Sequence, residues 1–264
     1  NDPHAFLVVI RHAILSQGSS GTQSRPGLWL SLIGFILAIL GFFFIPQIGI
    51  VSAMCSALVL VMSFGGVGAW IQLDRVRGQH PDEAIDGVRN VLRLLVLFAL
   101  ITPFWSLFDQ KASTWVLQGE QMTKPEWFPA SVMQSLNPLL VMILIPFNNF
   151  VLYPLLRWAG VKVTSLRRMG AGIAFTGLAW IVVGGLQLAI DGGDPVTIVW
   201  QIIPYALMTF GEVLVSATGL EFAYSQAPLS MKGVITSFWN LSVTVGNQWV
   251  LLANSSVKGA AVTT

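Results

Sequence analysis

Charged side chains are scarce in this sequence of 264 residues. Asp, Glu, Lys and Arg together make up 10% of it, whereas hydrophobic residues make up 54%. Ordinary soluble domains carry about 25% charged residues, and a soluble domain of this length cannot keep so much apolar surface from water. The composition excludes a cytosolic enzyme and a disordered chain, and it indicates an integral membrane protein.

The sequence also has few residues for redox, metal or acid–base chemistry. Its single cysteine, Cys55, cannot form an internal disulfide. The three histidines, His4, His12 and His80, lie in polar segments outside the apolar stretches. The net charge of +2 is too balanced for binding nucleic acid. We therefore expect no enzymatic activity, no metal, no cofactor and no nucleic-acid partner.

Long apolar stretches predict seven membrane-spanning helices. Residues 26–73 contain no charged residue and no histidine, which is enough for two spans of about 20 residues with a turn near 45–49. No stretch alternates as a membrane strand does. The spans are predicted at residues 28–45, 49–73, 90–118, 133–157, 167–190, 196–226 and 232–257. The chain then divides into a segment 1–27, a helix pair 28–73, a linker 74–89 and a five-helix bundle 90–264.

The charges of the connecting loops predict which side of the membrane each loop faces. The loop around Arg157 and Arg168 contains only bases, whereas the next loop contains Asp191 and Asp194. Because basic loops stay in the cytoplasm, we expect segment 1–27, linker 74–89 and the Arg157–Arg168 loop to be cytoplasmic. The C-terminal tail is then outside. The sequence has no signal peptide and no initiator methionine, and we expect it to be a fragment.

Carboxylates within the predicted spans are the candidate functional residues, because an unpaired charge in lipid costs several kcal/mol. Glu212 lies mid-span, and Ser216, four residues later, shares its helix face. Trp105 and Asp109 have the same spacing, and Glu221 lies nearer the cytoplasm. Each acid could line a solute pathway, carrying a proton or holding an ammonium group, or it could form a structural ion pair between helices.

Several segments resemble the proton-coupled oligopeptide transporters of the major facilitator superfamily. They are FWSLFDQ at 104–110, LNP at 136–138, GEV at 211–213 and TGLEFAYSQAP at 218–228. That family has two six-helix bundles, and many bacterial members insert two further helices between them. The resemblance implies that 28–73 is the inserted pair and that 90–264 holds helices seven to eleven. The first bundle, with its ExxER motif, lies outside this sequence.

The resemblance also implies roles for individual residues in binding. Glu212 is expected to meet the amino terminus of a peptide, with Ser216 one turn away. Asn137 is expected to hydrogen-bond the peptide backbone. Trp105 and Trp239 are expected to form aromatic walls of the pocket.

The resemblance further implies that other residues act in gating. Phe108 resembles an apolar residue of the extracellular gate, and Asp109 resembles the acid that closes this gate by pairing with an arginine of the first bundle. Lys111 departs from the family pattern and is expected to affect how Asp109 pairs. Glu221 is expected to be a structural or gating acid.

The function implied is proton-coupled symport of di- and tripeptides by alternating access in a bacterial cytoplasmic (inner) membrane. The proton gradient would drive it, and the lipid bilayer and the N-terminal six-helix bundle would be its partners. Two alternatives remain open: a transporter of nitrate or another anion within the same family, and a non-transporting membrane scaffold.

Overall fold

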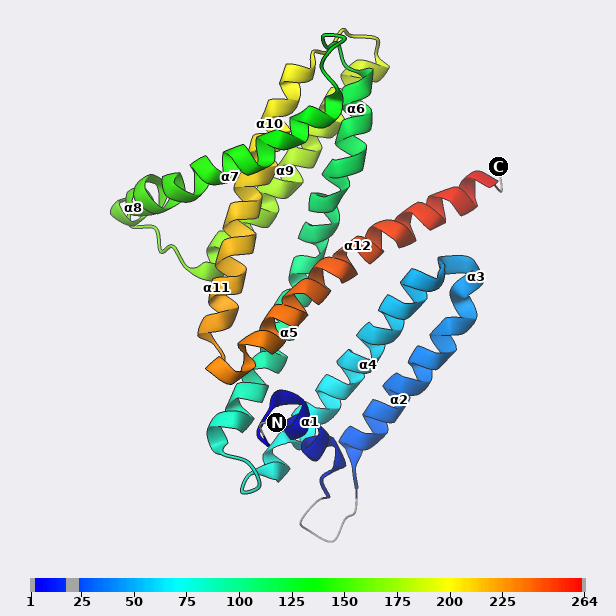
Figure 1. The fold of residues 1–264 in the computed structure, drawn as a ribbon, viewed down its shortest axis with the longest axis vertical. Coiled ribbons are helices and arrows are strands. Elements are labelled where there is room, and N and C mark those ends of the chain that lie inside the picture. Colours follow the sequence, from blue (N-terminus) through cyan, green and yellow to red (C-terminus); the bar gives the residue numbers. More distant parts are fainter. Residues whose placement is uncertain (1–2, 18–23, 263–264) are drawn as a thin grey trace. The chain divides into compact units, whose positions relative to one another are not determined.

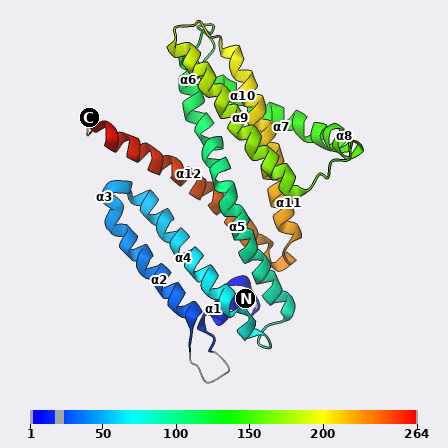
Figure 2. The same cartoon turned by 180° about the vertical axis from the view of Figure 1, so that it is seen from behind.

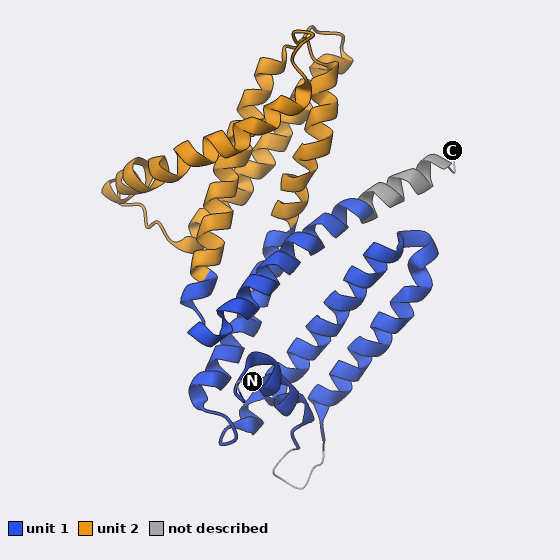
Figure 3. Ribbon diagram, viewed as in Figure 1, with its two compact units in different colours: residues 1–102, 223–264 blue, residues 103–222 orange. Residues whose placement is uncertain are grey.

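The chain folds into helices, as its composition predicts. The computed structural model describes residues 3–17 and 24–262, with side chains as far as residue 251. Over these residues it contains helices and two isolated bridges but no strand. The helices form two compact units, one of residues 1–102 and 223–264 and the other of residues 103–222 (Figure 3). The all-α fold class is therefore confirmed.

The first unit contains a helical hairpin made by α2 (Pro26–Gly41) and α4 (Ile50–Gln72), which lie side by side (Figures 1 and 2). Between them come the short helices η1 (Phe42–Phe44) and α3 (Ile45–Ile48). Gly49 makes the turn into α4 at φ +81°, a conformation that favours glycine. Where α2 and α4 approach, a side chain on Gly68 would collide with the backbone of Gly27. Small residues therefore set the hairpin's close packing.

The remaining helices of this unit are α1 (Phe6–Leu15), η2 (Leu73–Val76), the start of α5 (Asp82–Gln110), η8 (Leu229–Met231) and α12 (Lys232–Val262). The sequence pattern does not predict helix α1, because segment 1–27 as a whole is polar and the helix is only ten residues long. It buries Phe6, Val9 and Ala13 and packs on α4. The Gln72 amide joins these elements: it donates to the Ala13 carbonyl at 3.2 Å and accepts from the Gly27 amide.

The second unit is built on the long helix α9 (Ser165–Asp191) and on α10 (Ile202–Glu212), which lie side by side (Figures 1 and 2). Its core includes Trp115, Ala179, Tyr205 and Met208. The other elements of the unit are η3 (Lys111–Trp115), α6 (Val116–Gln121), η4 (Ala130–Ser135), α7 (Leu136–Phe147), η5 (Asn148–Leu152), α8 (Tyr153–Trp158), η6 (Ile198–Gln201), η7 (Val213–Ala217) and α11 (Thr218–Ser225).

Five helical stretches of the described residues are long and apolar enough to cross a membrane. The first, Pro26–Val76, contains both arms of the hairpin, and the others are Asp82–Gln121, Ala130–Trp158, Ser165–Asp191 and Ile198–Ser225. The seventh predicted span, 232–257, lies on α12. Each predicted span therefore falls on helix, although α5 begins at Asp82, eight residues before the predicted start.

The three histidines, which are far apart in the sequence, meet in the first unit. The Nδ1 atom of His80 lies 2.9 Å from His4 Nδ1, and its Nε2 atom lies 2.8 Å from His12 Nδ1. The pKa of His80 lies below its ordinary value of 6.5. The main cause is burial, and the charges of His12 and then His4 lower the pKa further. The packed state therefore favours neutral His80, and protonation opposes the packing of α1 against the 77–81 segment.

This predicts that acid loosens α1. A freed His80 binds protons more readily than the packed one as the pH falls below 6.5, so the packing is lost in that direction. Hydrogen exchange of the amides of Phe6–Leu15 should be faster at about pH 5.5 than at about pH 7.5 after correction for intrinsic rates. His80→Gln, which does not titrate, should weaken this dependence, whereas Arg11→Gln should retain it. Equal pH dependence in His80→Gln and the natural protein would contradict the role of His80.

Candidate functional site

The predicted residues Asn137 and Glu212 are in direct contact. The Nδ2 atom of Asn137, in the first turn of α7, lies 2.7 Å from the Oε2 atom of Glu212, the last residue of α10. Glu212 is partly exposed and lies near the middle of the span Ile198–Ser225. A charge-assisted hydrogen bond is about twice as strong as a neutral one. This contact therefore stabilises a carboxylate at a depth where water is scarce.

The hydrogen bonds around Asn137 fix which way its amide faces. A second Nδ2 bond reaches Thr209 Oγ1 at 3.0 Å, and this hydroxyl donates to the Tyr205 carbonyl at 2.8 Å. Because the Thr209 hydroxyl hydrogen is used on Tyr205, Thr209 can only accept from Asn137, so the group that faces Thr209 and Glu212 must be the amide NH₂. Both NH₂ hydrogens are then engaged within the protein. Among the described residues Oδ1 has no hydrogen-bond donor, so it can accept from a ligand N–H.

Each of the three helical stretches that carry Asp109, Asn137 and Glu212 widens into a π-helix. The segment η3 starts two residues after Asp109, η7 starts directly after Glu212, and η5 follows α7. Ser216 lies within η7 and is partly exposed, as Glu212 is. The wider turn changes the angle between these two side chains from that of a regular helix. Such π segments are frequent at functional sites, and no pattern in the residues predicts them.

The aromatic side chains of the FWSLFDQ segment contact one another. The Trp105 ring contacts the edges of Phe104 and Phe108 at centroid distances of 5.0 and 5.9 Å. The Trp180 indole, from α9, donates to the Leu107 carbonyl at 3.1 Å. This part of α5 is therefore joined to α9 by the Trp180 hydrogen bond.

Lys111 is a cation of the site that the sequence reasoning did not place there. Its ammonium lies 3.3 Å from the centroid of the Phe108 ring, and the side chain is 8% exposed. The carboxylates of Glu212 and Asp109 act electrostatically on it. Lys111 departs from the family pattern in the sequence. Only the fold shows that Glu212 is close enough to interact electrostatically with it.

The other predicted residues are more dispersed. Glu221 is exposed on α11, nine residues beyond Glu212. Trp239 belongs to the first unit, on α12, where its ring meets Phe98 edge-on at 5.6 Å. The structure thus brings Asn137, Glu212 and Lys111 into one region of the second unit, and it places Trp239 in the other unit.

A close crossing of two helices positions Glu212. Its neighbour Gly211, on α10, faces Gly172 and Thr176, on α9. A Cβ atom on Gly211 would lie 2.6 Å from the Gly172 carbonyl oxygen and 2.6 Å from Thr176 Oγ1. Real Cβ atoms do not come this close to backbone, so both positions require glycine. The depth and rotation of Glu212 depend on this crossing.

Comparison with known proteins now identifies the family. Residues 70–260 match the family model described as PTR2: POT family. The chain belongs to the POT family. The resemblance found in the FWSLFDQ and TGLEFAYSQAP segments is thereby confirmed.

Relatives of the POT chain include solute carriers. Human "Solute carrier family 15 member 2" is 36% identical over 126 residues, which cover 47% of this chain and 17% of that protein. Mouse "Solute carrier family 15 member 3" is 28% identical over 207 residues, 64% of this chain and 36% of that protein.

Solved POT structures are similar over the whole chain. One, titled as an auto inhibited POT family peptide transporter, has 63% identity and a TM-score of 0.96, covering 100% of this chain and 51% of that one. The POT family transporter PepTSo has 65% identity and a TM-score of 0.94, covering 100% and 52%. The chain thus spans about half the length of these structures and less of the curated relatives. It is a multi-pass integral membrane POT chain of the expected fold.

The glycine crossing predicts a stability difference between two alanine variants of the full-length protein. Gly211→Ala should lower its stability by about 1–3 kcal/mol, because the added methyl overpacks the crossing. Gly177→Ala, on α9, is the control: no heavy atom lies within 4 Å of its added Cβ, and alanine favours helix. Thermal unfolding in detergent measures both. Equal midpoints would show that the crossing is not tight.

Proposed function

We propose that this chain forms the second half of a transporter that moves di- and tripeptides together with protons across a bacterial cytoplasmic membrane. The observation that carries the proposal is the mid-span Asn137–Glu212 contact at 2.7 Å. Names and titles of relatives and solved structures, which include peptide transporters, support it. The first six-helix bundle would supply the other wall of the pathway, and alternating access would expose the pathway to each side in turn.

The polar groups suit features that every short peptide shares. Glu212 would accept from the peptide ammonium, and Ser216 would help to orient it. Since its NH₂ group is engaged, Asn137 would use Oδ1 to accept from a peptide N–H. Trp105 would line the space for variable side chains. A few fixed polar groups in a roomy aromatic pocket give broad selectivity.

The proton gradient would act through the same charges, with no cofactor. A carboxylate inside the membrane must be protonated or matched by a cation. Glu212 has Lys111 as an electrostatic neighbour, and a bound ammonium would compete for it. Protonation would therefore shift the balance between conformations. Glu221, exposed on α11, would act on gating or structure rather than on the ligand.

Lys111 also gives the rival substrate class a physical basis. A buried ammonium attracts anions, so nitrate or another anion is the alternative cargo. The two nearby carboxylates oppose this reading, because they repel an anion. Uptake of labelled nitrate, without peptide uptake, by the reconstituted full-length protein would replace the proposal. Uptake of neither would favour the membrane scaffold.

The first functional prediction concerns Glu212 in the full-length transporter. Glu212→Gln keeps the size of the side chain but removes the charge that would meet the ammonium. A charge-assisted hydrogen bond contributes about 1.5–3 kcal/mol, so the Kd for a dipeptide should rise roughly 10- to 150-fold. Isothermal titration or competition binding measures this change.

Its control is a peptide whose amino group is blocked. An N-acetylated dipeptide should bind weakly to the natural protein and lose little more in Glu212→Gln. Glu221→Gln, on the same helical stretch, should not distinguish the two peptides. Equal losses for free and acetylated peptides in Glu212→Gln would make Glu212 a structural acid.

The second functional prediction concerns the gate. Asp109 would pair with an arginine of the first bundle when the outside is closed, with Phe108 as the apolar part of the gate. Asp109→Asn should therefore reduce proton-driven accumulation of peptide in vesicles while preserving much of the exchange of peptide for peptide. Unchanged gradient-driven uptake would remove Asp109 from the mechanism.

A further inference from the structure

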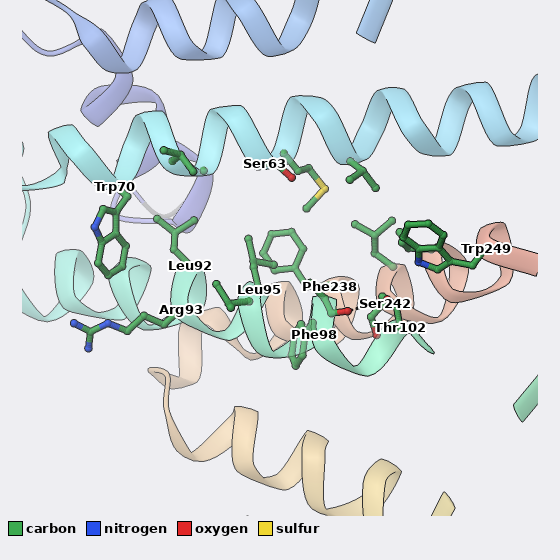
Figure 4. A pocket seen from close by; sticks show the side chains of 18 residues that line it. Ser63, Trp70, Leu92, Arg93, Leu95, Phe98, Thr102, Phe238, Ser242 and Trp249 are labelled. Carbon is green, nitrogen blue, oxygen red and sulfur yellow. Dashed lines mark hydrogen bonds between the residues drawn. The ribbon is translucent and has the colours of Figure 1, made fainter. Parts of the chain in front are cut away.

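An apolar groove of about 690 Å³ lies within the first unit, and neither Glu212 nor Asn137 lines it. Its walls come from α4, α5 and α12, and Figure 4 shows the side chains that line it. Apart from Ser63, Arg93, Thr102 and Ser242, the lining side chains are apolar or aromatic. The hydroxyls of Thr102 and Ser242 are used within their own helices, on the Ala99 and Trp239 carbonyls. The groove therefore suits an apolar occupant.

The groove has the length of one membrane leaflet. On α4 its lining runs from Val59 to Trp70, and on α12 from Phe238 to Trp249. Eleven residues of helix span about 16 Å. Half of a hydrocarbon core about 30 Å thick is about 15 Å. A single acyl chain lying along the helices would extend from the headgroup level to the bilayer centre.

One end of the groove carries a positive charge, from Arg93. Its guanidinium lies 5.4 Å from the centroid of the Trp70 ring, and both residues lie at one end of the groove in Figure 4. Trp70 is two residues from the end of α4, where an indole marks the headgroup region. The groove is thus charged at the interface and apolar in depth.

The neighbouring carboxylates are paired with other arginines. Arg77 pairs with Asp74, Asp82 and Asp86, and Arg89 pairs with Asp74. Among the described residues, no carboxylate lies within 4.0 Å of Arg93. Its side chain is exposed and open to an anion from outside the chain.

We propose that this groove binds an anionic phospholipid, with the headgroup phosphate on Arg93 and one acyl chain along α4, α5 and α12. Every lipid tail is equally apolar, so the tail gives little selection within a bilayer. The headgroup gives the selection, because guanidinium matches phosphate in charge and geometry. Basic pockets between membrane helices bind anionic headgroups in this way. The site does not depend on the peptide-transport proposal.

The test uses the full-length transporter in nanodiscs of phosphatidylglycerol and phosphatidylcholine in equal amounts. Native mass spectrometry after release counts the lipids that stay bound. The natural protein should retain phosphatidylglycerol preferentially. Arg93→Gln should lower that preference about fivefold, the effect of one basic side chain at an anionic surface, whereas Arg93→Lys should keep most of it. Arg167→Gln, an exposed base of the second unit, should keep it fully.

A second pair of variants tests the groove itself. Ser63→Phe fills it and should abolish the retained lipid with Arg93 intact. Val61→Phe, on an exposed part of α4 that does not line the groove, should have no effect. The proposal would be overturned if Arg93→Gln kept the full preference for phosphatidylglycerol, or if Arg167→Gln lost as much of it as Arg93→Gln. It would also be overturned if Ser63→Phe still retained the lipid. A loss of dimers rather than lipid in Ser63→Phe would overturn it as well, because a second copy would then occupy the groove.

Discussion

A carboxylate within a membrane span cannot rely on water, and the surroundings of Glu212 follow from this constraint. The Asn137 amide donates to it, Thr209 holds the same amide, and the Tyr205 carbonyl accepts from Thr209. An unpaired buried polar group costs more free energy than a single hydrogen bond contributes, so each of these groups needs its partner. The chain of bonds therefore joins α7 to α10 and fixes where the charge lies.

The same constraint explains how irregular helices are tolerated in this chain. Pro103 has no N–H to donate to the Ala99 carbonyl, and the Thr102 hydroxyl donates to that carbonyl instead, at 2.8 Å. Near η3, the Gln201 amide donates to the Trp115 carbonyl at 2.8 Å. Side chains thus replace missing ladder bonds, which is the condition for bent helices in lipid. Irregularity of this kind is compatible with the proposed transport, in which helices would move.

Much of this architecture could be predicted from the sequence, and the rest depended on contacts across long separations. Runs without charge located the helices because lipid excludes charge over a whole span. The i, i+4 spacing related Glu212 to Ser216, but the partner of Glu212 is 75 residues away. The meeting of His80 with His4 likewise joins residues 76 apart. Helix α1 was missed because ten residues with buried Phe6 and Val9 are too short to stand out by composition.

The surroundings of a charged side chain in this protein differ with its depth in the membrane. Glu212, at mid-span, accepts a hydrogen bond from Asn137 of its own protein. Arg93 lies over the Trp70 ring near the end of α4, and within the described part of the chain no carboxylate pairs with it. At the end of the groove far from Arg93, near Trp249, Gln248 ties α12 to α4: its amide donates to the Ser52 carbonyl at 3.1 Å. In lipid such a bond has no competition from water. The uncharged hairpin can therefore be held at the side of α12 by polar contacts, and its apolar surface remains available to the bilayer.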